Sequence, residues 1–263
     1  MDEKSLEKLL ETGSEMVGSI TGAFIGTAIA GPIGTIVGAS LPALISKSLN
    51  KISDDVLNRN ISKREEQKIG VGYHYAIRRI EKNINAGKEI RKDGFISNDS
   101  ILSDSSTILE GVTLKLQREW ELKKLQFYGN FLGNISFTED IDFNYATVLL
   151  KFAETLSYRQ ICLIKVFVKK GTPQINLAHI ANEYRRRLTI DSFNYPLYSD
   201  LADMDRMSIL QRLPPISLGD AIGNCVLSEM GLKLYHLMNL EEIEEDDYSK
   251  ALDGLQRMLP NKL

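Results

Sequence analysis

The chain has 263 residues, of which 43% are hydrophobic and 25% are charged, with 19 glycines and two cysteines. These proportions exclude the collagen-like, disulfide-stapled and fully disordered classes. The net charge of −3 excludes a basic nucleic-acid module by bulk charge. Cys162 and Cys225 have no close CxxC or CxxH partner, so we expect two reduced, apolar side chains in a cytoplasmic protein. The acidic N-terminus predicts no export.

The most unusual feature is a stretch of 31 residues without a charge, from residue 16 to residue 46, within a first region over 1–60. Its glycines recur at a spacing of four on either side of a helix-breaking Gly-Pro pair: Gly18, Gly22 and Gly26, then Gly31-Pro32, then Gly34 and Gly38. Small residues at this spacing let helix backbones approach closely. The pattern predicts a glycine-zipper helical hairpin.

Two interpretations of this hairpin stay open. It inserts into or lies on the inner membrane, or it packs tightly within a soluble core or an oligomer interface. The first arm, of about 18 residues, would reach about 27 Å as a helix, whereas the second, of about 14, would reach only about 21 Å. The second arm is therefore short for a membrane span, and the sequence favours the membrane only slightly.

A second region, over 61–155, has helical periodicity. Ser62 and Glu65 form a capping-box pattern, and the apolar stripe that follows continues until Gly87. Residues 93–105 are polar and rich in turn formers, which predicts a connection. A long helix is expected over 107–129, with Trp120 directed inward, and a further helix through residues 146–153.

The third region, over 156–263, changes character. We expect helices over 157–170, 176–188 and 197–211, a small β-hairpin over 216–227, and a closing helix from Ser228. This order is that of a winged helix-turn-helix. The acidic run over 241–247 then begins a last helix, where negative charge suits the helix dipole. The fold class is thus mainly α, with a winged-helix-like C-terminal domain.

Three segments resemble a known family: Tyr128-Gly-Asn-Phe-Leu-Gly-Asn, Leu156-Ser-Tyr-Arg-Gln-Ile-Cys-Leu-Ile-Lys-Val-Phe and Val226-Leu-Ser-Glu-Met-Gly-Leu-Lys-Leu-Tyr. They look like the closing half of Abi-alpha-type bacterial abortive-infection proteins, over about half of the chain. The resemblance implies a role in phage defence or stress without known catalytic residues. The unbroken glycine run over 16–46 departs from the pattern expected of that family.

Basic residues form two groups of candidate contacts with an anionic surface. The segment 62–92 is net positive and carries the first group: Arg78, Arg79, Arg91 and Lys92. It rests on lipid headgroups, where each nearby cation contributes about 1 kcal/mol, or it is an ordinary solvated face. The second group is Arg185, Arg186 and Arg187, which a solvated helix end also explains.

DNA binding is disfavoured, although the winged-helix order invites it. The helix expected in the major groove carries Asp200, Asp203 and Asp205, and the expected wing has no Lys or Arg. Phosphate contacts need cations on those two elements. We therefore expect the module to pack within the protein or to recognise another protein. A DNA-binding regulator is the third and least favoured function.

The sequence matches none of the enzyme motifs that we considered. Gly26 and Gly31 have the glycine spacing of a phosphate-binding loop, but Pro32 and Ile33 stand where its Lys and Ser or Thr would be. The three histidines, at positions 74, 179 and 236, lie far apart. We expect no catalytic residue, metal or cofactor. The predicted function is a non-enzymatic effector that acts through residues 16–46 at the membrane. The expected partners are further copies of the chain in a homo-oligomer, membrane lipid and a protein trigger. The alternative is a soluble oligomeric scaffold or interaction protein.

Overall fold

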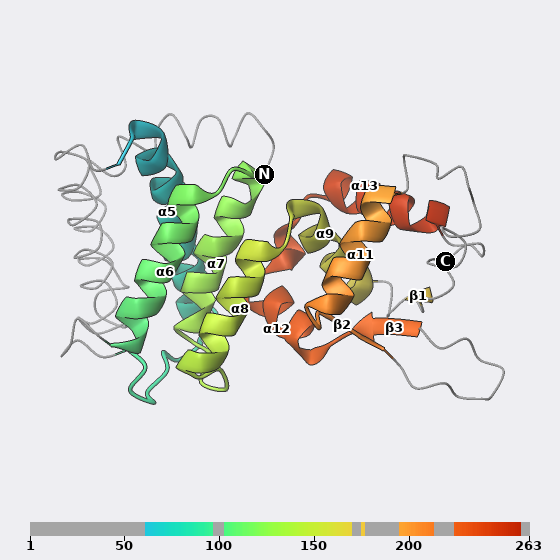
Figure 1. The fold of residues 1–263 in the computed structure, drawn as a ribbon. Coiled ribbons are helices and arrows are strands. Elements are labelled where there is room, and N and C mark those ends of the chain that lie inside the picture. Colours follow the sequence, from blue (N-terminus) through green and yellow to red (C-terminus); the bar gives the residue numbers. More distant parts are fainter. Residues whose placement is uncertain (1–60, 97–102, 170–174, 177–194, 213–223, 259–263) are drawn as a thin grey trace. The chain divides into compact units, whose positions relative to one another are not determined.

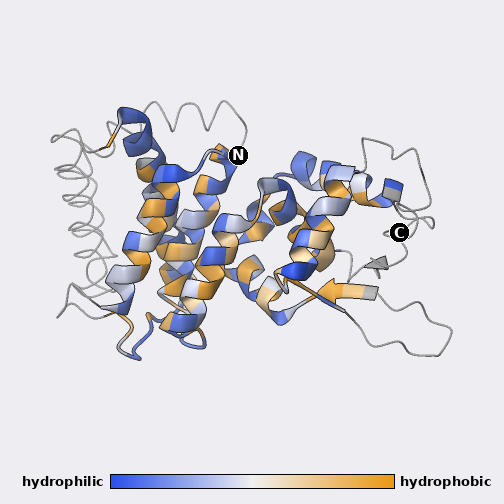
Figure 2. Cartoon of the chain, in the orientation of Figure 1, coloured by the Kyte–Doolittle hydropathy of each residue, from blue (hydrophilic) through white to orange (hydrophobic). Residues whose placement is uncertain are grey.

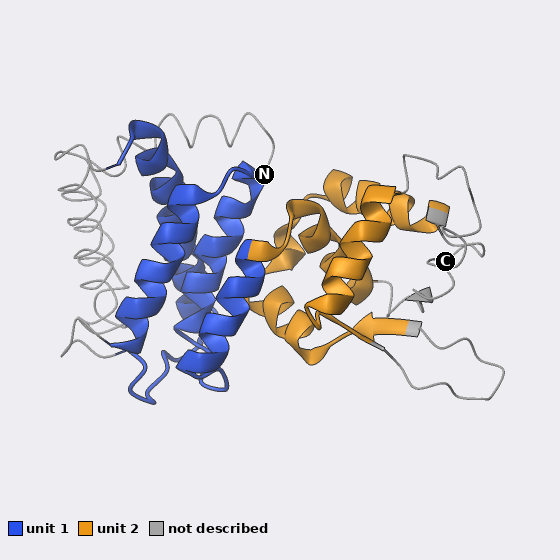
Figure 3. Cartoon of the chain, viewed as in Figure 1, with its two compact units in different colours: residues 1–154 blue, residues 155–263 orange. Residues whose placement is uncertain are grey.

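A computed structural model describes residues 61–96, 103–169, 175–176, 195–212 and 224–258 (Figure 1). These residues are mainly helical and include one small antiparallel sheet, which confirms the mainly-α fold class. The predicted glycine-zipper hairpin over 1–60 and the basic cluster at 185–187 lie outside the described residues. The chain divides into two compact units, residues 1–154 and 155–263 (Figure 3).

Unit 1 consists of four α-helices and a short 3-10 helix in its described part: α5 (Lys63–Asn85), α6 (Asp104–Arg118), η2 (Leu122–Lys124), α7 (Leu125–Ile135) and α8 (Phe143–Thr155). The predicted capping box is present, since Ser62 Oγ accepts from the Glu65 amide and Glu65 Oε2 accepts from the Ser62 amide. The hydrophobic residues of α5 and α6 alternate with polar ones (Figure 2). Each helix therefore has one face suited to the core and one suited to water.

The centre of unit 1 is the contact between α5 and α7, which run in the same direction. Every residue of α7 is buried. Two glycines on α7 remove the side chains that would hold the helices apart: a Cβ atom would come within 2.7 Å of the Tyr75 Cβ at Gly129, and within 2.8 Å of the Ala76 carbonyl oxygen at Gly133. Further along the same contact, Asn83 Nδ2 donates to Asn134 Oδ1 at 2.8 Å.

Helices α6 and α8 run in the opposite direction to α5 and α7. Lys68, near the start of α5, bonds carbonyls at the end of α6, and Tyr73 bonds Thr113 one turn earlier on α6. The last turn of α8 returns to the start of α7, because Lys124 Nζ donates to the Glu154 carbonyl at 3.2 Å. One end of unit 1 thus collects the start of α5, the end of α6, η2 and the end of α8.

Unit 2 alternates helices with three short strands: α9 (Tyr158–Lys169), β1 (Ile175–Asn176), α11 (Tyr195–Arg206), β2 (Leu210–Arg212), β3 (Asn224–Leu227), α12 (Glu229–Leu237), η3 (Leu240–Glu242) and α13 (Glu245–Met258). The strands form one antiparallel sheet in the order β1-β3-β2, with Ile175 opposite Cys225 and Leu210 opposite Leu227. Side chains cap two helices of this unit, since Ser157 Oγ and Gln160 Oε1 accept from each other's backbone amides and Ser228 Oγ accepts from the Gly231 amide.

Three expected boundaries in unit 2 are wrong. The helix predicted over 197–211 ends at Arg206, because Ser208 takes a positive φ of 58° and the chain turns into β2. The strand that pairs with β3 is therefore β2, residues 210–212, and not a segment beyond residue 216. Residues 175 and 176 form a strand where a helix was predicted to begin.

Polar contacts tie the helices of unit 2 to α9. Lys165 is buried, and its Nζ donates to the carbonyl oxygens of Glu241 at 3.1 Å and Ile243 at 2.7 Å. Tyr158 donates to Asp247 Oδ2 at 2.7 Å, and Arg159 forms an ion pair with Asp200. These contacts hold η3 and α13, and the first half of α11, against one helix.

Candidate interaction surface around Trp120

Trp120, the only tryptophan of the chain, is 81% exposed. The helix predicted over 107–129 is interrupted, since α6 ends at Arg118, Glu119 has an extended backbone with ψ of 132°, and η2 begins at Leu122. The prediction that Trp120 points inward is therefore wrong. The stripe of buried residues on α6 stops at Leu116.

Glu119 fixes the shape of this loop from within. Its carboxylate is buried, and Oε1 accepts from the backbone amides of Trp120 and Glu121, both at 2.9 Å. Its Oε2 lies 2.8 Å from Lys124 Nζ and accepts from the Tyr128 hydroxyl at 3.0 Å. A carboxylate that receives two backbone N–H groups and two side-chain donors is a strong local organiser.

Lys68 clamps the same loop from α5. Its buried ammonium donates to the carbonyl oxygens of Gln117 and, at 3.0 Å, Glu119. Burial lowers the pKa of Lys68, and the charges of Glu65 and Glu119 oppose this shift. The last carbonyls of a helix have no partner within the helix, so Lys68 supplies the cap that ends α6 at this position.

Lys124 and Tyr128 complete the network. The Lys124 ammonium is almost fully buried, pairs with Glu119, donates to the Glu154 carbonyl and lies 5.5 Å from the centre of the Tyr128 ring. Burial, followed by the neighbouring negative charge of Glu119, raises the pKa of the Tyr128 hydroxyl, which therefore stays a donor. Taking such ions out of water costs several kcal/mol each unless their bonds are complete, and here each ion has several partners.

Chemically, this network offers a fixed loop and not a reactive group. The oxygens of Glu119 are occupied by four donors, and the donors of Lys68 and Lys124 point at carbonyls and at Glu119. What the loop leaves available is the indole of Trp120. An exposed tryptophan on a preorganised loop is typical of a binding anchor, because little conformational entropy is lost when it is buried.

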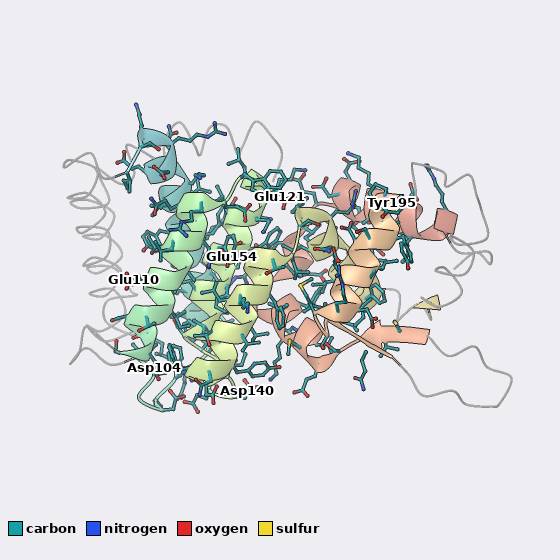
Figure 4. The ribbon with its side chains drawn as sticks, viewed as in Figure 1. Asp104, Glu110, Glu121, Asp140, Glu154 and Tyr195 are labelled. Carbon is teal, nitrogen blue, oxygen red and sulfur yellow. The ribbon has the colours of Figure 1, made fainter. Side chains whose placement is uncertain are left out.

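The charges around Trp120 differ from those at the other end of unit 1. Residues 61–68, 115–124 and 154 carry seven basic and five acidic side chains, whereas residues 82–93, 104 and 139–142 carry four basic and six acidic ones. Figure 4 shows Asp104 and Asp140 together at the second end, away from Glu121. Unit 1 is therefore polarised along its helices.

The basic residues predicted from the sequence have separate roles. Arg78 is exposed, and Arg79 is half-buried with its Nε 3.4 Å from Asn130 Oδ1. Lys92 is exposed and forms an ion pair with Glu89 at 2.5 Å. The structure thus does not gather these residues into one surface.

Arg91 is a correction to the predicted set of surface contacts. It is 4% exposed. Its guanidinium binds Asp93, donates to the carbonyl oxygens of Ile135 at 3.2 Å and Ile141 at 3.0 Å, and lies 3.9 Å from the centre of the Phe95 ring. Bonding to Arg91 lowers the pKa of Asp93. Arg91 therefore joins the loop after α5 to the loop after α7, and its charge is not presented to a lipid.

The described histidines and acidic residues lie apart from one another and do not form a metal-binding group. His74 is half-buried on α5, and burial, with Arg78 as the second cause, lowers its pKa. His236 lies on α12 beside Tyr235. Within the described part of the chain, no three His, Cys, Asp or Glu side chains lie close enough to hold a metal ion. His179 lies outside it.

The exposed side of α11 is acidic and aromatic. Tyr195 is 53% exposed, and Asp203 and Asp205 are half-exposed, with Arg206 paired to Asp203. Asp200 is turned inward, where burial raises its pKa and the bond from Arg159 opposes the rise. This surface lacks the free excess of cations that DNA phosphates require.

Comparison with known protein families, with curated proteins and with solved structures finds no match. None of the described helices combines the length and the hydrophobicity needed to cross a membrane.

Proposed function

We propose that the protein is a non-enzymatic effector that acts at a membrane through residues 16–46. The observation that carries this proposal is the stretch of 31 uncharged residues with glycines at a spacing of four, since such spacing promotes close helix association in lipid. The resemblance to Abi-alpha-type proteins suggests that the setting is abortive infection.

The described residues support a binding role and not a catalytic one. Three buried charged groups of unit 1, Lys68, Glu119 and Lys124, bond one another or the same loop and fix the backbone that exposes Trp120. A buried charge network whose members bond one another and nearby carbonyl groups has a structural role here, because it fixes the loop. The result of these contacts is that Trp120 is held exposed on a fixed loop, as an aromatic anchor for a partner.

For unit 2 we propose a winged-helix-like module that recognises protein. The order α9, β1, α11, β2, β3, α12, together with the antiparallel sheet order β1-β3-β2, supports this arrangement. The segment 177–194, where the second helix of such a module would lie, is outside the described residues. The acidity of α11 favours a protein trigger over DNA as the partner of this module.

A soluble oligomeric scaffold is the second candidate, and one observation favours it. Gly129 and Gly133, also spaced by four, pack α7 against α5 inside unit 1. This chain therefore uses such spacing for helix packing in a helix that does not span a membrane. The glycines of residues 16–46 would then form a contact of the same kind, within one chain or between copies.

Fractionation of cells that express the full-length protein separates the two candidates. The effector proposal expects protein in the membrane fraction and a loss of membrane potential on induction. Replacing Gly22 and Gly26 by Leu is expected to abolish this loss, with Gly254→Ala in α13 as the matched control. A wholly soluble protein that leaves the potential unchanged, and whose oligomers the Leu variant disrupts, would establish the scaffold instead.

DNA binding is tested by a mobility-shift experiment on the full chain. We expect no retarded complex at physiological salt. A salt-sensitive complex that disappears when Arg185, Arg186 and Arg187 are changed to Ala would overturn the assignment of unit 2 to protein recognition.

A further inference from the structure

We infer that the Trp120 end of unit 1 is the surface with which this unit rests on anionic lipid headgroups. The inference depends on the proposed membrane function and adds the part of the described fold that meets the lipid, and the lipid class. It is carried by three observations at one end of the bundle: an exposed indole, a loop of fixed shape beneath it, and a charge balance that is more basic than at the opposite end.

The exposed indole is the first observation. Trp120 is the most exposed of the large hydrophobic side chains in the described chain, at 81%, against 39–53% for the others. Tryptophan is enriched at membrane interfaces because its ring is apolar while its N–H keeps a polar partner at headgroup level. The Trp120 ring is exposed to water and can therefore enter the headgroup region without a change in the fold.

The fixed loop is the second observation. The amides of Trp120 and Glu121 are bound by the buried Glu119 carboxylate, and the carbonyls of Gln117 and Glu119 are bound by Lys68. These contacts leave the loop little freedom to fold Trp120 back onto the protein. The indole therefore stays at the end of the bundle, beyond the last turn of α6, whether or not a partner is present.

Charge complementarity selects the partner. Around Trp120, the exposed or half-exposed charged side chains are five cations and four carboxylates: Lys63, Arg64, Lys115, Arg118 and Lys123 against Glu65, Glu66, Glu121 and Glu154. The opposite end carries an acidic excess that includes Asp104, Glu139, Asp140 and Asp142. Near an anionic surface, a body polarised in this way turns its basic end toward the lipid and its acidic end away. An interfacial tryptophan flanked by cations is typical of proteins that lie on anionic bilayers.

The position of this end in the chain agrees with the proposed function. Helix α5 begins here, at Lys63, directly after the region that contains the uncharged stretch. If residues 16–46 act in the bilayer, then among the described elements of unit 1 the start of α5 is the nearest to them along the chain. The same end would then meet the headgroups.

The single tryptophan makes the test direct, because the intrinsic tryptophan fluorescence of the full chain reports Trp120 alone. The probes are vesicles of phosphatidylcholine with one quarter phosphatidylglycerol, and vesicles of phosphatidylcholine alone. With the anionic vesicles we expect the emission to move to shorter wavelength and to become protected from acrylamide. With the neutral vesicles we expect a much smaller change.

Variants separate the contributions of the indole and of charge. Trp120→Ala is expected to weaken sedimentation with anionic vesicles by about tenfold, and Arg118→Gln with Lys123→Gln by about fivefold for each cation removed. The matched controls are Lys88→Gln with Lys92→Gln at the acidic end, and Tyr195→Ala in unit 2. Both controls are expected to leave sedimentation unchanged.

The outcomes distinguish this inference from the proposed function. Full-length protein that sediments with vesicles while Trp120 keeps its aqueous emission would overturn the inference, leave the membrane function standing and assign Trp120 to a protein partner. Equal responses to neutral and anionic vesicles, or an equal loss in the Lys88 and Lys92 control, would overturn the role of charge. Protein that sediments with no vesicle would overturn the membrane function itself.

Discussion

Gly133 of α7 lies against the backbone of Ala76 in α5, so closely that a Cβ atom at residue 133 would come within 2.8 Å of the Ala76 carbonyl oxygen. Gly129, one turn earlier, has the same relationship to Tyr75 and to the amide of Ala76. The two glycines set the distance between the central helices of unit 1. The asparagine pair Asn83 and Asn134 forms at 2.8 Å across the same contact, and it depends on that distance.

Gly133→Ala should therefore separate α7 from α5. The atoms that the new methyl group would meet are backbone and Cβ atoms of Ala76 and Arg79, which cannot move without the helix. We expect unfolding to become easier by about 2 kcal/mol, the usual cost of overpacking. Urea denaturation followed by far-UV circular dichroism measures the change.

Gly254→Ala is the matched control, because its methyl group would meet only the end of the Leu197 side chain, at 3.3 Å. Within α13, alanine should be neutral or stabilising by up to about 1 kcal/mol. Equal losses in the two variants would contradict the idea that helix separation is the cause.

Glu119→Gln tests the buried network beneath Trp120. Glutamine keeps an oxygen for the amides of Trp120 and Glu121 but leaves the Lys124 ammonium without its counter-ion. Breaking one partner of a buried pair costs about 3–5 kcal/mol, so we expect a lower melting temperature and a more mobile loop. Thermal denaturation and tryptophan fluorescence anisotropy report the two effects.

The control for Glu119 is Glu89→Gln, which removes one partner of an exposed pair with Lys92. Such pairs contribute little to stability, so no measurable change is expected. If Glu119→Gln leaves both stability and anisotropy at their original values, the buried carboxylate does not organise the loop.

Arg91→Lys tests the junction of the two loops at the acidic end of unit 1. Lysine retains the charge, but it cannot bind Asp93 and the carbonyls of Ile135 and Ile141 together, because it lacks the planar fork of donors. We expect a loss of about 2 kcal/mol in unfolding free energy, from hydrogen bonds to a buried charged group. Lys92→Arg is the control, because Lys92 is the next residue in the sequence and is exposed. This variant should leave the unfolding free energy unchanged. A similar stability for both variants would count against the role given to Arg91.

His74 makes the stability of unit 1 depend on pH. Burial and Arg78 lower its pKa in the folded state, so below the usual histidine pKa of about 6.5 the unfolded chain binds more protons than the folded one. Stability therefore falls as the pH decreases through 6.5. His74→Gln should reduce the part of this loss that occurs between pH 7.5 and 5.5, as measured by urea denaturation. An identical pH dependence in the variant would show that other groups cause it.

Much of the helical structure could be predicted from the sequence, because it is signalled locally. The capping box at Ser62 and Glu65 and the caps at Ser157 and Ser228 lie within four residues of the backbone groups that they satisfy. The acidic first turn of α13 is equally local. Helical periodicity also identified several of the buried residues of α5, and Leu109, Val112 and Leu116 of α6.

The candidate site could not be predicted, because its determinants are far apart in the sequence. The end of α6 depends on Lys68, which is about 50 residues earlier and bonds the carbonyls of Gln117 and Glu119. Trp120 was predicted to point inward because it follows Leu116 by four residues, the spacing of one helical turn. The charged pair Lys123 and Lys124 marks the end of the apolar pattern on this helix. Arg91 was likewise misread, since an arginine in a polar segment is ordinarily exposed and only the carbonyls of Ile135 and Ile141 explain its burial.

The sequence by itself therefore determined the mainly-α class and most helix starts in the described chain, since caps and periodicity act over a few residues. Tertiary structure alone decided which helix ended early, which charges were buried and which aromatic side chain remained in water. The physical reason is that a buried charge needs partners from several elements at once, and only the packed fold brings Lys68, Glu119 and Lys124 together.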